Sequence, residues 1–256
     1  MKNSPIGMFD SGIGGITIFN SIKKLLPKEN IIYYSDNFNS PYGGKSKSKI
    51  QELSIKNTEF LVNKGCKLII VACNTATTNS IEELRFNFNI PFVGVEPAIK
   101  PAALQTKTGH IGVLATKGTL SSDLFNNTSN HHGSQVKIVE KNAEGLVELI
   151  EKGIFDGEKI ENILQECLTP MIKKNIDFLV LGCTHYPILI KTIKSLLPKK
   201  IEIIDSGKAV AKQTKKLLLE NKIENTSYVG KDYFYCNGES ESLNKILNNK
   251  FIINKL

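Results

Sequence analysis

Arginine is nearly absent from this chain. The sequence also shows no apolar segment of the kind that spans a membrane or directs a protein across one. Arg85 is the only arginine among 33 basic residues, so almost no bidentate guanidinium clamp is available for a carboxylate or a phosphate. The longest apolar run, Leu68 to Cys73, is far too short to cross a bilayer, and no apolar signal-peptide core precedes the first predicted strand. We therefore expect a cytoplasmic protein without a membrane partner.

The cysteines lack the spacing of a disulfide framework, and the lysines lack the aromatic neighbours of a nucleic-acid surface. The five cysteines form no C-x-x-C pair and are odd in number, which argues against disulfides and against the usual zinc knuckle. The net charge of +8 comes from lysines dispersed as doublets, mostly near predicted helix ends. Because such lysines are typical of solvated helix faces, we expect no nucleic-acid partner.

Short β-rich runs alternate with segments of helical period along the whole chain. One helical stripe, Ile50–Leu61, ends before Gly65, and another, Leu146–Ile150, ends before Gly153. Strands that are apolar on both faces and alternate with helices predict parallel sheets covered on both sides. The predicted strands are Ile6–Phe9, Ile31–Tyr34, Leu68–Ala72, Phe92–Val95, Ile111–Ala115, Val136–Val139, Phe178–Leu181 and Ile201–Ile204.

The two halves of the chain resemble each other. Ile6–Phe9 recurs as Ile111–Leu114, and Cys73–Thr75 recurs as Cys183–His185 at a nearly equal offset. A third pair of predicted strands follows in the same order. Matched strands in matched order indicate a duplicated α/β unit, and a chain of 256 residues favours two domains over one core.

We therefore predict an α/β fold of two similar domains with mainly parallel sheets flanked by helices. The two domains are expected to be related by a pseudo-twofold axis, with the active site in the cleft between them. The segment after Ser206 has no counterpart in the second unit, so it is expected to return to the first domain. The predicted domains are residues 1–96 plus 207–256, and residues 97–206.

Two cysteines, Cys73 and Cys183, follow predicted strands directly, where an open parallel sheet places its ligands. Two thiols on matching strand ends suggest a site where one substrate atom is flanked by two acid/base groups. A metal site that also uses His185 is an alternative, although the spacing is unlike that of known zinc sites. The remaining cysteines are expected to be small buried hydrophobes, namely Cys66, Cys167 and Cys236.

A glycine-rich turn, Asp10–Gly15, links the first predicted strand to a helix that runs to Pro27. Its backbone N–H groups could cradle an anion, or the turn could simply be tight and empty. Asp10 could cap the helix, orient or deprotonate Cys73, or bind an ammonium group. The segment Ser40–Gly44 is either a binding loop or a plain turn.

Several motifs together resemble those of bacterial glutamate racemases, which belong to the cofactor-independent aspartate/glutamate racemase family. The similarity runs over nearly the whole chain. Gly182–Pro187 together with Pro41–Gly43 favours glutamate over aspartate as the substrate. The motifs that carry the resemblance are Asp10–Gly15, Pro41–Gly43, Cys73–Ala76, Gly94–Pro97, Gly182–Pro187 and Asp205–Gly207.

The resemblance implies a two-base mechanism without pyridoxal phosphate, metal or any other cofactor. Cys73 and Cys183 would flank the substrate α-carbon, one thiolate removing a proton while the other thiol delivers one, and Cys183 would face the proton of L-glutamate. Asp10 would assist Cys73, His185 would assist Cys183, and Glu151 would help near the cleft. Substrate contacts would come from Asp10, Ser11, Tyr42, Gly43, Asn74, Thr75, Thr184 and His185.

The scarcity of arginine fits this expectation, since both carboxylates would be held by hydroxyls, amides and backbone N–H groups at helices beginning at Cys73 and Cys183. The substrate L-/D-glutamate is the expected small-molecule partner, and the resemblance leaves room for a homodimer. D-Glutamate would serve peptidoglycan synthesis, and through it cell-wall biogenesis and cell shape. Three alternatives stay open: a racemase for aspartate or another amino acid, a thiol-based redox or metal-binding module, and a non-catalytic anion-binding protein.

Overall fold

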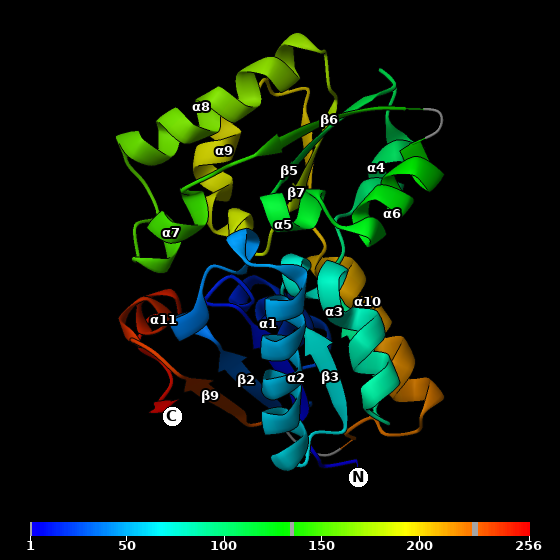
Figure 1. Ribbon diagram of the computed structural model, residues 1–256, viewed down its shortest axis with the longest axis vertical. Coiled ribbons are helices and arrows are strands. Elements are labelled where there is room, and N and C mark those ends of the chain that lie inside the picture. Colours follow the sequence, from blue (N-terminus) through cyan, green and yellow to red (C-terminus); the bar gives the residue numbers. More distant parts are fainter. Residues whose placement is uncertain (1, 134–135, 227–229) are drawn as a thin grey trace.

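The computed structural model describes residues 2–133, 136–226 and 230–256. The predicted domain ranges also contain residues 1, 134–135 and 227–229, which lie outside the described residues. Figure 1 shows two lobes, one above the other, each built from a central sheet with helices packed on it. No helix in the described part of the chain has both the length and the apolarity needed to span a bilayer.

The first lobe holds a parallel sheet in the order β10-β9-β2-β1-β3-β4. Its strands are β1 (Ile6–Asp10), β2 (Ile31–Ser35), β3 (Leu68–Val71), β4 (Phe92–Gly94), β9 (Asp232–Cys236) and β10 (Ile253–Lys255). Its helices are α1 (Ile16–Leu25), α2 (Lys47–Asn63), α3 (Asn74–Asn87), α10 (Gly207–Glu220) and α11 (Glu241–Ile246), with short 3-10 turns η1 (Asn37–Asn39) and η2 (Tyr42–Gly44).

The second lobe holds a parallel sheet in the order β6-β5-β7-β8. Its strands are β5 (His110–Ala115), β6 (Lys137–Asn142), β7 (Phe178–Gly182) and β8 (Glu202–Ile204). Its helices are α4 (Ile99–Gln105), α5 (Lys117–Leu120), α6 (Asp123–Gly133), α7 (Leu146–Glu151), α8 (Glu158–Lys173) and α9 (Ile190–Leu196), with the 3-10 turn η3 (Tyr186–Leu189).

These two sheets confirm the predicted α/β fold of parallel sheets flanked by helices. The run β2-β1-β3-β4 in the first sheet has the same order as β6-β5-β7-β8 in the second, so each matched pair of strands occupies equivalent positions. The predicted helix ends are also observed, because Gly65 (φ 75°) and Gly153 (φ 72°) take the left-handed conformation just after α2 and α7.

Two strands of the first sheet, β9 and β10, were not predicted. Their residues are largely half-buried or exposed, with only Phe234 and Cys236 buried, so they lack the continuous apolar run that identifies a central parallel strand. They pair beyond β2 and bring the last part of the chain onto the first lobe.

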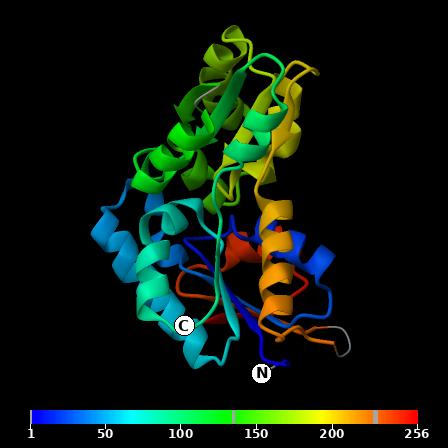
Figure 2. The same ribbon diagram turned by 90° about the vertical axis from the view of Figure 1, so that its right-hand side faces the viewer.

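The chain crosses between the lobes twice, once after β4 and once after β8 (Figure 2). One apolar cluster spans both lobes, since Ile13 and Val95 of the first belong to the same buried cluster as Leu114 and Ile150 of the second. The lobes are thus packed together, and the carboxyl ends of β1, β3, β5 and β7 are brought to one seam. Parallel sheets place their ligand sites at such ends.

Candidate active site

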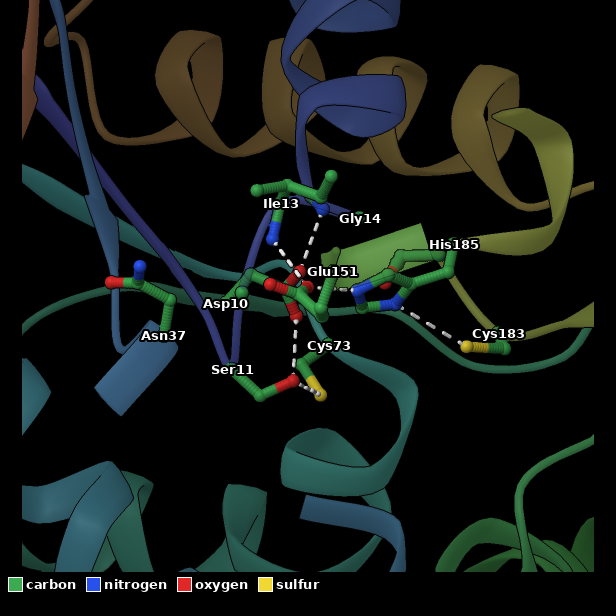
Figure 3. A network of polar contacts seen from close by, with 12 residues as sticks. Asp10, Ser11, Ile13, Gly14, Asn37, Cys73, Glu151, Cys183 and His185 are labelled. Atoms are coloured by element: carbon green, nitrogen blue, oxygen red, sulfur yellow. Dashed lines mark hydrogen bonds and ion pairs between the residues drawn. The ribbon is translucent and has the colours of Figure 1, made fainter. Parts of the chain in front are cut away.

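The two predicted thiols lie at the ends of equivalent strands on either side of the seam (Figure 3). Cys73 stands at the N-cap of α3, two residues after β3, and Cys183 directly follows β7. Their residues are only 5% and 7% exposed, so both thiols are shielded from bulk water. The structure therefore brings two proton carriers to one buried place from two different sheets.

Cys73 lies among groups from the turn after β1. Its thiol donates to Ser11 Oγ at 3.6 Å, and Ser11 Oγ in turn donates to Asp10 Oδ1 at 3.5 Å. The backbone N–H of Ala76 donates to Cys73 Sγ at 3.5 Å, which is the cap of α3. Asp10 is held by the N–H of Gly15 at 2.7 Å, so its carboxylate is fixed beside the thiol.

Burial decides the charge state on this side. Burial and then the Asp10 carboxylate raise the pKa of the Cys73 thiol well above its ordinary value, outweighing the hydrogen bonds that favour the thiolate. Burial also raises the pKa of Asp10, with Glu151 adding to the increase and His185 opposing it. Cys73 is therefore held as a neutral thiol at pH 7.

Cys183 lies at the end of a chain of groups within the second lobe. His185 Nδ1 is 3.6 Å from Cys183 Sγ, and His185 Nε2 is 2.5 Å from Glu151 Oε1. The same oxygen of Glu151 accepts the backbone N–H of Ile13 at 2.8 Å, across the seam. Burial alone would lower the pKa of His185, but its hydrogen bonds to Cys183 and Glu151 raise it well above the usual value. An imidazolium beside Cys183 is the favoured state.

The glycine-rich turn after β1 exists because the other lobe approaches it closely. A Cβ on Gly12 would overlap the Glu151 carboxylate, and one on Gly14 would overlap the His185 ring. Neither glycine has a positive φ, so the close approach, and not the turn itself, requires glycine here. Asp10 is not the N-cap of α1, which is Gly15.

The Tyr42–Gly43 turn meets the seam through its backbone. The Tyr42 hydroxyl is instead bonded within the first lobe. Tyr42 is buried, and its hydroxyl donates to Asp36 and accepts from Asn57 Nδ2 at 3.0 Å. A Cβ on Gly43 would come 3.0 Å from Thr116 of the second lobe, so the turn touches that lobe directly. Sequence alone gave no indication that the Tyr42 hydroxyl is already bonded.

Two predicted contact residues at the start of α3 also have protein partners. Asn74 Nδ2 donates to Val95 O at 3.1 Å, which fixes the end of β4. Thr75 Oγ1 lies 2.8 Å from Thr116 Oγ1 and 3.3 Å from Thr119 Oγ1, both in the second lobe. Thr116 and Thr119 were missed by the sequence argument. Thr116 follows β5 as Ser11 follows the equivalent β1, so the internal repeat carried the signal.

The expectation that Cys183 begins a helix as Cys73 does is wrong. Cys183 to His185 form a turn that leads into η3, and α9 starts only after η3 ends. The turn is held to the first lobe instead, where Thr17 Oγ1 donates to Thr184 O at 3.0 Å. Fewer aligned backbone N–H groups therefore face the site from this side than the sequence suggested.

A hollow opens at the seam beside the Tyr42–Gly43 turn, although neither Cys73 nor Cys183 lines it. It has a volume of about 120 Å³ and is lined by Pro41 and Gly43 of the first lobe and by Thr116 and Lys117 of the second. The single arginine is far away, because Arg85 is exposed in the last turn of α3, about 17 Å along the helix from its start. In the described ranges, no set of three or more His, Cys, Asp or Glu side chains is arranged to hold a metal ion.

The remaining cysteines are buried free thiols, as predicted. The structure thus gathers the predicted residues into two groups that face each other across the seam. The first group is Asp10, Ser11, Tyr42, Gly43, Cys73, Asn74 and Thr75, and the second is Glu151, Cys183, Thr184 and His185.

Comparison with known proteins agrees with this arrangement. The family described as Asp/Glu/hydantoin racemase matches residues 14–214. The chain belongs to this family. A glutamate racemase from Herpetosiphon aurantiacus is 46% identical over 218 residues, which are 85% of this chain and 86% of that protein. The resemblance to glutamate racemases seen in the sequence is thereby confirmed.

Solved structures of family members extend the similarity to three dimensions. A glutamate racemase isoform from Bacillus anthracis matches with a TM-score of 0.90 and 32% identity, over 100% of this chain and 98% of that one. A glutamate racemase from Francisella tularensis, solved in complex with D-glutamate, matches with a TM-score of 0.87 and 31% identity, over the same shares of the two chains. The two-lobed fold is therefore that of the family.

Proposed function

We propose that this chain interconverts L-glutamate and D-glutamate by two proton transfers at the α-carbon. The observation that carries the proposal is the pair Cys73 and Cys183, buried at the ends of the equivalent strands β3 and β7. Membership of the racemase family, with glutamate racemases as relatives, supports glutamate as the substrate. The D-glutamate formed would supply peptidoglycan synthesis, and with it cell-wall biogenesis and cell shape.

The charge states around the two thiols favour one starting point for the reaction. Cys73 is held as a thiol, so it can serve as the acid. Cys183 Sγ lies 3.6 Å from His185 Nδ1, so we assign it the role of the base. With L-glutamate bound, the Cys183 thiolate takes the α-proton and the electron pair of the C–H bond passes to the α-carbon. The Cys73 thiol then donates its proton to the opposite face. Cys183 ends as the thiol and Cys73 as the thiolate, and a turnover of D-glutamate restores the first state.

The carboxylates of the substrate would be held without arginine. Backbone N–H groups at the start of α3 and in the turn after β7 can donate to them, together with the hydroxyls of Ser11, Thr75 and Thr184. Asp10 would receive the ammonium group, and Glu151 would keep His185 oriented through the 2.5 Å contact. Tyr42 and Gly43 would contribute through the backbone, Asn74 through its place at the start of α3, and His185 through its ring.

We further propose the two lobes as domains of residues 1–96 plus 207–256 and residues 97–206, with substrate bound between them. The reaction needs neither metal nor pyridoxal phosphate, since the two thiols supply both proton transfers. A cytoplasmic location and a small-molecule substrate without a nucleic-acid partner complete the proposal.

Incubation of L-glutamate with the purified protein, without added cofactor and after EDTA treatment, tests the activity. Circular dichroism should decay to zero as the racemic mixture forms, and L-aspartate should react far more slowly. Activity lost with EDTA and restored by zinc, or a faster reaction with aspartate, would overturn the assignment.

The same reaction in heavy water tests the two-thiol step. At low conversion, new D-glutamate should carry deuterium while the remaining L-glutamate stays protiated, because different thiols serve the two faces. Cys73→Ser and Cys183→Ser should each remove most racemisation, since a hydroxyl is a far poorer acid and base. Protium in early D-glutamate, or near-normal rates in either variant, would contradict the mechanism.

A further inference from the structure

The C-terminal end of α7, which carries Glu151, lies against a helix of the opposite lobe. Figure 1 shows α7 at the lower edge of the second lobe, directly above α11 of the first. The contact is made by Lys245, in the last turn of α11. Its ammonium group donates to Gly153 O at 2.5 Å and lies 5.1 Å from the centre of the Phe155 ring.

The hydrogen bonds that end α7 leave the Gly153 carbonyl, which Lys245 contacts, without a backbone donor. The N–H of Gly153 donates to Ile150 O at 2.8 Å, and the N–H of Ile154 donates to Leu149 O at 3.0 Å, which closes the helix in a Schellman motif. This closure satisfies carbonyls inside the helix but not that of Gly153, which is buried. A buried carbonyl needs a donor, and Lys245 supplies it from the other lobe.

Glu151 depends on this end of the helix for its position. It is the last residue of α7, and its Oε1 atom meets both His185 Nε2 at 2.5 Å and the N–H of Ile13 at 2.8 Å. A helix of six residues has little stability of its own, so tertiary contacts fix its direction. The buried residues Leu146, Val147 and Ile150 hold one face of α7, but its last turn is held across the seam by Lys245.

We propose that Lys245 is a positioning residue that keeps Glu151 on His185 when the two lobes are together. The inference rests on the proposed racemase function. Without Lys245, the end of α7 can move by the few tenths of an ångström that separate a good hydrogen bond from a poor one. His185 then orients less well beside Cys183, and proton transfer at Cys183 slows, whereas the groups around Cys73 keep their contacts.

The test is Lys245→Met, which keeps the side-chain stem and removes the donor. Lys250→Met is the matched control, because Lys250 is an exposed lysine of the same C-terminal segment. We expect Lys245→Met to lower kcat about tenfold with KM within about twofold, as for loss of an interaction made in the transition state. Lys245→Arg, which can still donate and stack on Phe155, should restore most of the rate.

Isotope effects separate positioning from general damage. Slower transfer at Cys183 makes abstraction from L-glutamate more rate-limiting, so α-deuterated L-glutamate should show a larger isotope effect in Lys245→Met than in the unchanged protein. With α-deuterated D-glutamate, abstraction by Cys73 precedes the slow step, so the effect should stay equal or fall. Thermal unfolding of each variant, and Phe155→Leu as a milder change in the same contact, control for loss of folding.

The inference fails if Lys245→Met and Lys250→Met have equal kcat, or if both isotope effects rise together. It also fails if Lys245→Arg is as slow as Lys245→Met. These outcomes differ from failure of the proposed function, in which the unchanged protein would not racemise glutamate at all.

Discussion

Gly12 and Gly14 set how closely the two halves of the site approach each other. Each lies where a methyl group would overlap a side chain of the opposite lobe, Glu151 for the first and His185 for the second. Protein interiors yield little to such overlap, so the ring or the carboxylate would have to move. The positions of Glu151 and His185 on the Cys183 side therefore depend on Gly12 and Gly14 having no side chain.

Gly14→Ala should lower kcat at least tenfold, because the new methyl group displaces the His185 nitrogen that faces Cys183. Steady-state rates with L-glutamate give the measurement. Thermal unfolding of the variant controls for loss of folding. A kcat within about twofold of that of the unchanged protein would contradict the prediction.

Cys66 should make the protein less stable at high pH. Burial raises its pKa to about 12, whereas the thiol of the unfolded chain ionises near the ordinary value of 9.0. Between these values the unfolded state binds fewer protons, so the free energy of unfolding falls as pH rises, by about 1.4 kcal/mol per pH unit for one such group. This stabilisation is fully present below pH 9 and is lost toward pH 12.

Urea unfolding at several pH values between 8 and 10.5 checks this prediction. Cys66→Ala and Cys66→Ser differ in packing, but both remove the titrating thiol, so both should lose stability less steeply with pH than the unchanged protein. Three parallel curves would show that Cys66 is accessible enough to ionise in the folded state.

The residues of the site were predictable where strand ends marked them. Cys73 and Cys183 were found because each directly follows an apolar run, and the repeat places them alike. The partners of Tyr42 were not, since its hydroxyl meets Asp36 and Asn57, whose positions depend on how η1 and α2 pack. Hydrogen bonds between separate elements have no local sequence signal.

The segment after β9 supports the turn that carries Tyr42. Asn237 Nδ2 donates to the Asp36 carboxylate, which also accepts from the Tyr42 hydroxyl and from Asn39 Nδ2. Asn237 Oδ1 in turn accepts the N–H of Phe38 at 3.1 Å. The residue after β9 thus supports η1 and η2, beside the seam where we propose that substrate binds.

Asn237→Ala should raise KM for glutamate about three- to tenfold with kcat within about twofold, because a looser turn weakens ground-state and transition-state binding alike. Asn221→Ala is the matched control, since that exposed amide donates to the preceding helix, to Leu217 O at 2.8 Å. Initial rates over a range of glutamate concentrations measure both constants. A fall in kcat at constant KM would mean that Asn237 acts on the chemical step instead.

The strands β9 and β10 also show where sequence patterns stop being informative. Central strands such as β1 and β3 are buried along their whole length and were predicted within a residue of their ends. In β9, next to the edge strand β10, the same pairing is made by residues such as Tyr233, which is exposed, so the apolar run is interrupted. Strands at this end of the sheet are therefore defined by their neighbours more than by their own composition.

A buried ion pair joins segments that are far apart in the sequence, away from the seam. Lys67 Nζ lies 2.6 Å from Glu29 Oε2, and both side chains are 1% exposed. Lys67 also donates to Lys2 O at 2.6 Å, and Glu29 Oε1 accepts the N–H of Asn225 at 2.7 Å. The pair thus fastens the first residues, the start of β3 and the segment after α10 to one another.

Lys67→Met should lower the free energy of unfolding by about 3–5 kcal/mol, because it leaves the Glu29 carboxylate buried without a counter-charge. Adding Glu29→Gln should recover part of the loss, since the amide can still accept from Asn225 and carries no charge. Urea unfolding of the single and double variants measures both effects. A loss below about 1 kcal/mol in the single variant would mean that water reaches the carboxylate.

The arrangement of the whole molecule was predictable because the chain repeats itself. Two units with the same strand order leave few ways to place equivalent cysteines except at one shared edge. The repeat does not predict how the surroundings of the two thiols differ. Asp10 and Ser11 accompany one thiol, while His185 and Glu151 accompany the other, and nothing in the matched strands predicts that difference.

The substrates themselves limit what this difference between the surroundings of the two thiols can do to the kinetics. Mirror-image molecules have equal free energies in water, so the equilibrium constant of their interconversion is one, and kcat/KM must be the same in both directions. Asp10 and His185 act differently on the two thiols, but this difference cannot make kcat/KM higher for one enantiomer than for the other. The difference can appear only when the enzyme is saturated. Because kcat/KM is equal, the enantiomer with the lower KM must have a kcat that is lower by the same factor.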